Sequence, residues 1–327
     1  MRGLKTAFGM LLACSLAATV TPALAADSYP NKPIRLMVGF PPGTATDTVA
    51  RLIAERLGQL YKWNVIVENK PGQAGSIGAT DIARSAPDGY SLLISANGPL
   101  STNPNLFAST IRYDTRKDFT AISKVGILPM LLVVGKDAPY KTVQDLLDAA
   151  KAKPGDLNYA SLGQGSTAHL IAATFATKTG TEYMHVPYKG SSETAVALIS
   201  GDVDFMFDTA LATLPQIEAN RMRALGVSTG TRMQGMPDIP TVAESGVPGF
   251  DMAAWLGIVG PVGIPEDIVK KLNAGIHEAL SSPEVIQRMR GLGSEVDLST
   301  PEEFREFLVS EYDKWGAAID QAGVPRQ

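Results

Sequence analysis

Short apolar runs alternate with longer segments of helical periodicity along most of the chain. The first apolar run, residues 34–40, has the length of a buried strand and stops at residues 41–43. Two prolines there supply no amide donor, and the glycine permits unusual backbone angles. Residues 49–60 then repeat apolar positions at helical spacing, and Thr46 or Asp47 is placed to cap this helix. The pattern predicts a strand, a tight turn and a helix N-terminus in succession.

The same alternation continues to the C-terminus. It predicts further strands at residues 65–68, 91–95, 119–125, 129–135, 158–162, 182–186, 204–208 and 223–228, and an extended segment at 258–261. It predicts further helices at residues 76–85, 142–153, 169–179 and 192–200, and two long helices that begin at Pro265 and Thr300. Strands that alternate with helices favour an α/β protein with mainly parallel sheets.

The order of these elements predicts two α/β lobes. We expect residues 26–125 and 223–327 to form the first lobe and residues 126–222 to form the second. The expected strand at residues 223–228 is the segment that would return the chain to the first lobe. A chain of this length can support two hydrophobic cores.

The first 25 residues have the features of a signal peptide. Arg2 and Lys5 give a basic start, an apolar segment follows, and Ala23-Leu24-Ala25 fits a signal-peptidase site. The apolar segment is shorter than the ~18 residues that a membrane-spanning helix needs. We therefore expect cleavage after Ala25 and a soluble periplasmic protein.

The only cysteine, Cys14, offers an alternative to simple export. It ends the sequence Leu11-Leu12-Ala13-Cys14, which resembles a lipoprotein cleavage box, so the protein would be anchored at Cys14. This alternative leaves the Ala23-Leu24-Ala25 site without a role. If cleavage follows Ala25, the mature chain holds no cysteine, which excludes disulfides, thiol chemistry and cysteine metal sites.

The net charge of the chain argues against a nucleic-acid ligand. The chain has 29 basic and 33 acidic residues, and loss of Arg2 and Lys5 leaves a net charge near −6. No basic block is present, so nothing supports nucleic-acid binding. An acidic protein that binds an anion must do so through local dipoles and not through its overall field.

Four loops follow the carboxyl ends of expected strands and open helices. They are residues 41–47, 69–76, 163–167 and 188–192, two from each expected lobe. In an open α/β sheet ligands lie beyond these strand ends, and helix N-termini attract anions. If the lobes face each other, their helix N-termini converge on one anion, whereas a single such loop is an ordinary connection between a strand and a helix.

We expect ligand-binding residues in these loops and at two further strand ends. The candidates are Phe40, Pro42, Gly43, Thr44, Thr46, Asp47, Asn97, Gly163, Gly165, Ser166, Thr167, His169, Tyr188, Lys189 and Asp208. Gly43, Thr44 and Thr46 would donate amides and hydroxyls, while Gly165, Ser166 and Thr167 would form a second cradle. Asp208 could accept from a ligand hydroxyl or amine.

Several of these candidates have a structural alternative. Asp47 either caps its helix or orients a water molecule. His169 is either a packed neutral side chain or a ligand contact, and Lys189 either pairs with a distal carboxylate or is solvated.

Other classes of protein receive little support. Gly163-x-Gly165-x-x-Ala168 imitates a dinucleotide fingerprint, but it begins in mid-chain and no acidic residue ends the next strand. Asp202 and Asp204 lack the further oxygen ligands of a metal site. We expect no cofactor. An exported hydrolase is the rival hypothesis, although only three histidines are present to act as the base beside a nucleophile.

Segments along the whole expected mature chain resemble those of one family. They are Gly39-Phe40-Pro41-Pro42-Gly43, Glu68-Asn69-Lys70-Pro71-Gly72, Asp88-Gly89-Tyr90, Gly163-Gln164-Gly165-Ser166, Val186-Pro187-Tyr188-Lys189-Gly190, Gly201-Asp202-Val203-Asp204, Arg223-Ala224-Leu225-Gly226-Val227 and Pro240-Thr241-Val242-Ala243-Glu244. The family is the Bug family, the extracytoplasmic solute receptors of tripartite tricarboxylate transporters. One departure is Thr44, where many relatives carry a second glycine.

The resemblance implies a type II periplasmic binding-protein fold, with two α/β lobes that close on a ligand in the cleft between them. It implies a carboxylate ligand, such as a di- or tricarboxylate, an aromatic acid or an acidic amino acid, held by loop amides, hydroxyls and ordered waters. The implied partners are the membrane subunits of the transporter, and the protein would act as a monomer. Hinges are expected near Val125 and Met222. A receptor that signals to a membrane protein without transport is an alternative that the sequence leaves open.

Overall fold

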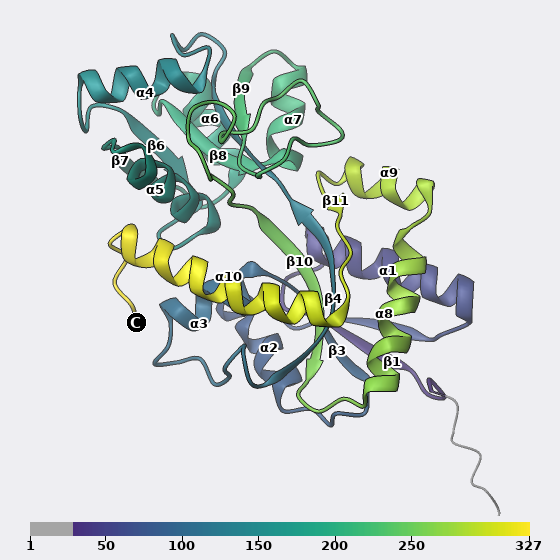
Figure 1. The fold of residues 1–327 in the computed structure, drawn as a ribbon. Coiled ribbons are helices and arrows are strands. Elements are labelled where there is room, and N and C mark those ends of the chain that lie inside the picture. The colour runs from purple at the N-terminus through teal and green to yellow at the C-terminus, as the bar shows by residue number, and fades with distance from the viewer. Residues whose placement is uncertain (1–28) are drawn as a thin grey trace, which may run out of the picture.

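The computed structural model describes residues 29–327, which form two α/β lobes, each built on its own sheet (Figure 1). The expected signal peptide and the Cys14 alternative lie outside these residues. The first sheet has the strand order β11-β4-β10-β3-β1-β2 and the second has the order β7-β6-β8-β5-β9. We refer to each sheet and the helices that cover it as the first and the second lobe.

The first lobe holds both ends of the described chain. Its strands are β1 (Ile34–Val38), β2 (Val65–Asn69), β3 (Ser91–Ala96), β4 (Phe119–Leu128), β10 (Ala254–Pro261) and β11 (Glu295–Val296). Its helices are α1 (Ala45–Tyr61), α2 (Ser76–Ala83), α3 (Asn103–Leu106), α8 (Glu266–Leu280), α9 (Pro283–Gly291) and the start of α10 (Pro301–Gln321), with short turns η1 (Gln73–Gly75) and η2 (Gly98–Thr102).

Strand β1 is apolar and buried except at Arg35, because helices cover both faces of the first sheet. Leu36 and Val38 point into a core shared with α1 and α8, while Met37 points into the core on the other face, with Ile82 of α2 and Phe304 of α10. Strands buried on both faces show a continuous apolar run and no alternation. This arrangement leaves the carboxyl end of β1 free to open into the loop that precedes α1.

The first sheet is mixed and not mainly parallel. Strand β1 pairs in parallel with β2 and β3, as its βαβαβ order predicts. Strand β10, however, runs antiparallel to both β3 and β4, and β11 runs antiparallel to β4. The expectation of a mainly parallel sheet was wrong here because the returning strand enters from the second lobe and not through a helical crossover.

The second lobe is built in the same way around a smaller sheet. Its strands are β5 (Met130–Gly135), β6 (Asn158–Ser161), β7 (Met184–Pro187), β8 (Phe205–Thr209) and β9 (Met222–Val227). Its helices are α4 (Val143–Ala152), α5 (Thr167–Thr179), α6 (Ser191–Ser200) and α7 (Ala210–Glu218). Strands β7 and β8 pair in parallel with β6, while β5 runs antiparallel to β8 and β9.

Strand β9 corrects the expected division of the chain. It belongs to the second sheet, because it pairs with β5 from Leu131↔Val227 to Gly135↔Met222. The chain therefore does not return to the first lobe at residue 223. It also enters the second lobe later than expected, since β4 stays in the first sheet up to Leu128. The two strand connections between the sheets lie at Pro129 and at residues 228–253, and not at Val125 and Met222.

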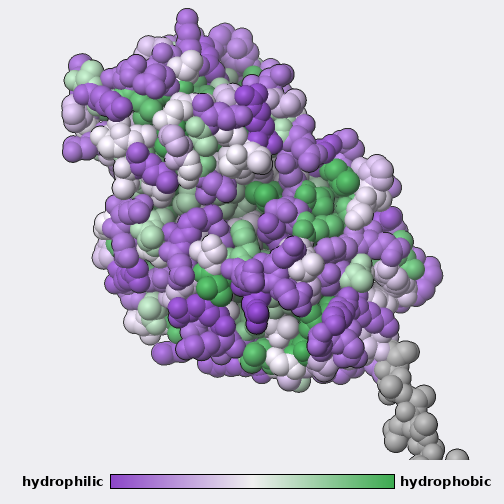
Figure 2. All heavy atoms as spheres, viewed as in Figure 1, coloured by the Kyte–Doolittle hydropathy of each residue, from purple (hydrophilic) through white to green (hydrophobic). Residues whose placement is uncertain are grey.

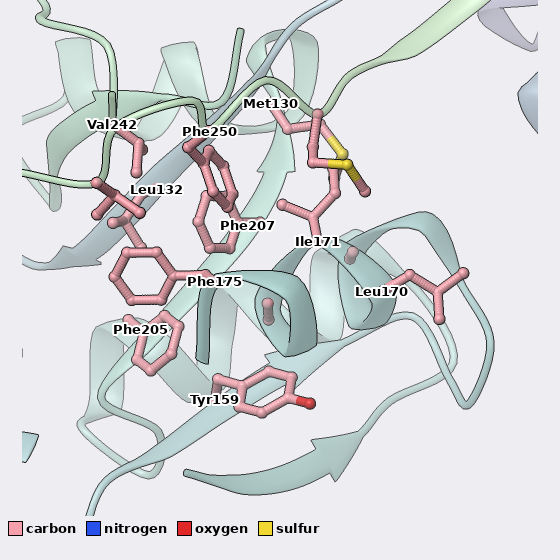
Figure 3. Close-up of a cluster of buried hydrophobic side chains, with 14 of the residues drawn as sticks. Met130, Leu132, Tyr159, Leu170, Ile171, Phe175, Phe205, Phe207, Val242 and Phe250 are labelled. Atoms are coloured by element: carbon pink, nitrogen blue, oxygen red, sulfur yellow. The ribbon is translucent and has the colours of Figure 1, made fainter. Parts of the chain in front are cut away.

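The segment after β9 stays in the second lobe and completes its core. Val242 and Phe250 pack beside Leu132, Phe175 and Phe207 (Figure 3). Phe207 and Phe250 are stacked with ring centroids 6.0 Å apart. This contact holds residues 228–253 on the second lobe until β10 begins.

Helix α10 is a third connection between the lobes, and Figure 1 shows it passing from one to the other. Its first half contributes Phe304 to the first lobe's core, and its second half contributes Trp315 to the second lobe's core. Between them, the carboxylate of Glu311, which is 2% exposed, accepts from the indole nitrogens of Trp255 at 2.8 Å and Trp315 at 2.7 Å. The relative position of the lobes therefore depends on a buried hydrogen-bonded group.

The face drawn in Figure 2 is largely hydrophilic, with hydrophobic residues in separate groups. Within residues 29–327, no helix combines the length and the apolar character that crossing a membrane requires.

Candidate ligand-binding site

The loop between β1 and α1 ends in a hydroxyl cap. Gly43 has φ +85°, a backbone conformation that residues other than glycine rarely adopt. Thr44 is the N-cap of α1: its Oγ1 accepts from the Asp47 amide at 3.4 Å and donates to the Pro41 carbonyl at 3.0 Å. The expectation that Thr46 or Asp47 caps this helix was wrong, since the helix begins earlier, at Ala45.

Asp47 instead anchors the loop from inside the first turn of α1. The side chain is almost fully buried, and its Oδ2 accepts from the Gly43 amide at 2.9 Å and from Arg51 Nε at 3.0 Å. Its Oδ1 accepts from Arg51 Nη2 at 3.0 Å and from Asn69 Nδ2 at 2.9 Å. Burial alone would raise the pKa of this carboxyl, but the hydrogen bonds from Arg51, Gly43 and Asn69 lower it below the ordinary value. Asp47 is thus an ionised, fully hydrogen-bonded anchor.

The matching loop of the second lobe lies between β6 and α5. Ser166 is the N-cap of α5, and its Oγ accepts from the His169 amide at 3.3 Å. The Gly165 amide donates to Nδ1 of His169 at 3.0 Å. The Ser161 hydroxyl accepts from the Gly163 amide at 3.1 Å. The loop is thus held to the strand before it and to the helix after it, and His169 lies in the first turn of that helix, as predicted.

His169 is a packed neutral side chain, the structural alternative considered for it. It is 5% exposed and stacks on His185, with ring centroids 4.0 Å apart and an angle of 13° between planes. Tyr159 stacks against both rings, with its centroid 5.1 Å from that of His185 and 6.3 Å from that of His169. Burial and the neighbouring His185 lower the pKa of His169 to about 4, and burial lowers the pKa of His185. The bond from Gly165 requires Nδ1 to be the unprotonated ring nitrogen.

Two contacts join the loops of the two lobes. Asn97, at the end of β3, donates from Nδ2 to the Thr167 hydroxyl at 3.3 Å. Gly165, which has φ +75°, faces Leu106 of α3 so closely that an added Cβ would lie 2.6 Å from Leu106 Cδ2. The structure therefore brings the predicted residues Asn97, Gly165 and Thr167 together at the interlobe face.

Several amides at the N-termini of α1 and α5 have no acceptor within residues 29–327. They are the first two of each helix, Ala45 and Thr46 in α1 and Thr167 and Ala168 in α5. Such amides cannot form bonds within their own helix, and they lie at the positive end of its dipole. The Gly43 and Gly165 amides, in contrast, already donate to Asp47 and His169, so these glycines shape the loops and are not the open donors.

Asp208, Tyr188 and Lys189 are the remaining side-chain candidates. Asp208 is buried at the carboxyl end of β8. Tyr188 packs beside the second lobe's core, and Lys189 is exposed, with its backbone amide donating to Glu193 Oε2 at 3.2 Å. In the described part of the chain, no hydrogen bond or ion pair joins either side chain to Asn97, Thr167 or Asp208.

Sequence reasoning missed residues of neighbouring strands and helices that hold the loops. They are Arg51, Asn69, Leu106, Ser161 and His185. Asn69 could have been predicted, because it ends β2. Since β2 pairs in parallel with β1, the two strands end at the same edge of the sheet, beside the loop that follows β1. Nothing in the sequence pairs His185 with His169, because they meet only when β7 lies beside β6.

The arrangement offers poor chemistry for catalysis or metal binding. His185 Nε2 and the Ser161 hydroxyl are 2.6 Å apart, which imitates a nucleophile and its base. Ser161 is only 1% exposed, however, and the hydroxyl is already shared with the Gly163 backbone. Across residues 29–327, no group of three or more His, Cys, Asp or Glu side chains could hold a metal ion.

Two α/β lobes, each built on its own sheet and joined by the Asn97–Thr167 hydrogen bond, have the architecture of a periplasmic solute-binding protein. A family model described as "Tripartite tricarboxylate transporter family receptor", TctC, matches residues 48–324, so the chain belongs to that family. This confirms the resemblance to the Bug family and the two-lobed fold.

Relatives of known structure and sequence agree. Protein BugT of Bordetella pertussis is 34% identical over 308 residues, which cover 94% of each chain. The structure of Rpa4515 with adipate from R. palustris is 35% identical, covering 90% of this chain and 98% of that chain, with a TM-score of 0.76. MatC from Rhodopseudomonas palustris with bound malate is 30% identical, covering 89% of this chain and 100% of that chain, with a TM-score of 0.71.

Proposed function

We propose that the protein captures a small organic carboxylate between its lobes and delivers it to the membrane subunits of a tripartite tricarboxylate transporter. The observation that carries this proposal is the interlobe hydrogen bond from Asn97 to Thr167 at the N-terminus of α5, together with the equally capped N-terminus of α1 in the other lobe. The adipate and malate bound to two relatives support a carboxylate as the class of ligand. The protein would be exported with its signal peptide cleaved after Ala25.

In this proposal the open amides of the two helices hold the carboxylate. Thr46 and Ala168 are almost fully buried, so their amides are poorly placed to be satisfied by bulk water. Hydrogen bonds from amides to a charged acceptor contribute about 1.5–3 kcal/mol each. Asp47 and His169 keep the loop glycines in place, and the Thr44, Ser166 and Thr167 hydroxyls lie beside the same amides. The lobes would close by bending at Pro129 and at the point where residues 228–253 lead into β10.

Neither rival gains support at this site. A hydrolase needs an accessible nucleophile, and Ser166, which is half-buried, uses its hydroxyl oxygen as a helix cap. A receptor that signals without transport would bind the same ligand, so only its partner differs. Purification of the ligand-loaded protein with the transporter membrane subunits separates transport from signalling.

The binding test uses calorimetry and thermal melting with acetate, succinate, malate, adipate, citrate and benzoate. We expect at least one to bind and to raise stability by about 2.7 kcal/mol at one hundred times its dissociation constant. A panel that leaves the melting temperature unchanged at millimolar ligand would contradict the proposal.

A matched pair of variants tests the amides directly. Ala45→Pro removes one donor at the first position of α1, where proline is tolerated and where Thr44 already has the extended conformation that precedes proline. We expect affinity to fall by about tenfold or more, while Ala45→Gly, which keeps the amide, changes it by less than about threefold. Equal affinities for the two variants would remove this amide from the site.

A further inference from the structure

Asp208 is a buried carboxylate with an incomplete set of hydrogen bonds. The residue is 2% exposed, and its Oδ1 accepts from the Thr209 amide at 2.7 Å. Its Oδ2 is buried and has no hydrogen-bond partner in the described part of the chain. The Ser191 hydroxyl approaches this carboxyl, but no hydrogen bond of acceptable geometry joins it to Oδ2.

The end of β8 that carries Asp208 lies where the lobes meet. Two residues after Asp208, the Ala210 amide donates to the Pro129 carbonyl at 3.2 Å. Pro129 lies in the connection between the two sheets. Leu211 contacts the first lobe at Gly293, which lies between α9 and β11. A Cβ added to Gly293 would lie 2.5 Å from the amide nitrogen of Leu211. Strand β6, which pairs in parallel with β8, ends in the loop that carries Thr167. Asp208 therefore lies on the interlobe face, on the side of the second lobe.

A comparison with Asp47 shows what is unusual about Asp208. Both side chains are 2% exposed, but Asp47 uses both oxygens to hold its own loop and a neighbouring strand. An acceptor that is buried without a partner costs stability, and such groups in native structures require an explanation. Burial also raises the pKa of Asp208, with the Ser191 hydroxyl and the Thr209 amide acting in the opposite direction. Its incomplete bonding is what a group reserved for a ligand would show.

We propose that Asp208 selects carboxylate ligands that carry a hydrogen-bond donor, a hydroxyl or an ammonium group, on the side facing the second lobe. This inference rests on the proposed function. The ligand carboxylate would lie at the amides of α1 and α5, and its donor would complete the bonding of Asp208 Oδ2. A ligand with nothing to donate leaves that oxygen buried and unpaired, which is the strongest form of discrimination available to a polar site. Hydroxy- and amino-carboxylates are therefore the expected class.

The test compares ligands that differ only in the donor. The purified protein is titrated calorimetrically with succinate, malate and aspartate, and with adipate and 2-aminoadipate. We expect the donor-bearing member of at least one set to bind about tenfold or more tightly than its parent dicarboxylate. In Asp208→Ala this preference is expected to fall to within about threefold, because no acceptor is left.

Asp208→Asn distinguishes the two kinds of donor. It keeps a carbonyl oxygen that accepts from a hydroxyl but loses the charge that favours an ammonium group, so a preference for malate would survive and a preference for aspartate would not. Asp204→Asn is the matched control at the amino end of the same strand, where Asp204 accepts from the Asn158 amide at 2.9 Å. This control is expected to leave ligand selectivity unchanged, and Asp208→Asn is expected to melt no lower than the wild type.

The failure of this inference differs from the failure of the proposed function. Tight binding of succinate or adipate with no preference for their donor-bearing relatives would overturn the role of Asp208 alone. A preference that persists unchanged in Asp208→Ala would do the same. If no carboxylate binds the wild-type protein, the proposed function itself fails.

Discussion

The loop of residues 39–47 in the first lobe and that of residues 162–169 in the second follow the same plan. Each leaves a buried strand, contains glycine with positive φ, and ends in a hydroxyl N-cap, Thr44 or Ser166. In each, the residue three positions after the cap reaches back to the glycine amide before the cap: Asp47 to Gly43 and His169 to Gly165. Both loops therefore leave the same two helix amides open.

The two loops differ in the chemistry of that anchoring residue. The first lobe uses an ionised carboxylate that also pairs with Arg51 and Asn69. The second uses a neutral imidazole stacked on His185. The same backbone arrangement can thus be held by a charged carboxylate or by a neutral ring. The pKa of the anchoring residue then sets the pH below which each loop loses its anchor.

Loss of Asp47 should have the largest effect. Asp47→Ala removes the acceptor for the Gly43 amide, for Asn69 and for Arg51 at once, and Asn69 and the amide lie partly buried. We expect the free energy of unfolding to fall by about 2–3 kcal/mol in urea denaturation, because hydrogen bonds to charged groups are the strong ones. Arg51 contributes little to this loss, since about half of its side chain is exposed and solvated.

His169→Ala is the matching change in the second lobe. It removes one acceptor and part of a ring stack but breaks no ion pair, so the expected loss is smaller than for Asp47→Ala. An equal or greater loss for His169→Ala would show that the charged network adds nothing over the neutral ring.

The order of strands and helices was predictable from the apolar pattern, but not which sheet each strand joins. Residues 223–228 form a strand as expected, yet its partner is β5 and not a strand of the first lobe. A continuous apolar run fits any strand with both faces covered, so periodicity cannot select the sheet. The connection at residues 228–253 has no long apolar run of its own, although Val242 and Phe250 lie in the second lobe's core.

The sequence located the loops of the candidate site better than it assigned roles within them. Gly43 and Gly165 are correctly placed at turns, but their amides are occupied by Asp47 and His169, so the open donors are the next helix amides. The cap of α1 was placed too late because Thr44, Thr46 and Asp47 are all good capping residues. Partners such as His185 come from other strands, and only the sheet brings them together.

Acid should weaken the second loop before the first. The pKa of His169 is about 4 in the folded protein and about 6.5 in the unfolded chain, so the unfolded state binds more protons between these values. Stability is therefore fully present above about pH 6.5 and is lost as the pH falls towards 4, at up to about 1.4 kcal/mol per pH unit for this group. Protonation of Nδ1 also places a proton against the Gly165 amide and a charge against His185, with Tyr159 and Ser161 the other groups at this stack.

Urea denaturation at several pH values checks this order. His169→Gln does not titrate and should lose less stability between pH 6.5 and 4 than the wild type does, while His185, whose pKa burial also lowers, contributes equally to both proteins. Asp47 has a lowered pKa, so its contribution is present above the ordinary value of 3.8 and is lost only below it. The variant Asp47→Asn should therefore differ from the wild type in pH dependence below about pH 4 and not above it. A wild-type profile that is flat from pH 6.5 to 4 would contradict the role of the histidines.

Substitution of the helix caps should have the smallest effect on stability, but the two variants should differ in their effect on ligand preference. Thr44→Gly and Ser166→Gly each remove a capping hydroxyl, which costs only a few tenths of a kcal/mol when glycine replaces it. Thr44 also donates to the Pro41 carbonyl and adds a β-branch beside the open amides, so its loss should change the shape of the first loop and with it the relative affinities for carboxylates. Ser166 makes no such second contact in the described part of the chain, and Ser166→Gly should weaken the binding of all ligands alike.

Calorimetry of Thr44→Gly and Ser166→Gly across one carboxylate panel tests this difference. If the ratios of affinities in Thr44→Gly match those of the wild type, Thr44 shapes no part of the ligand preference.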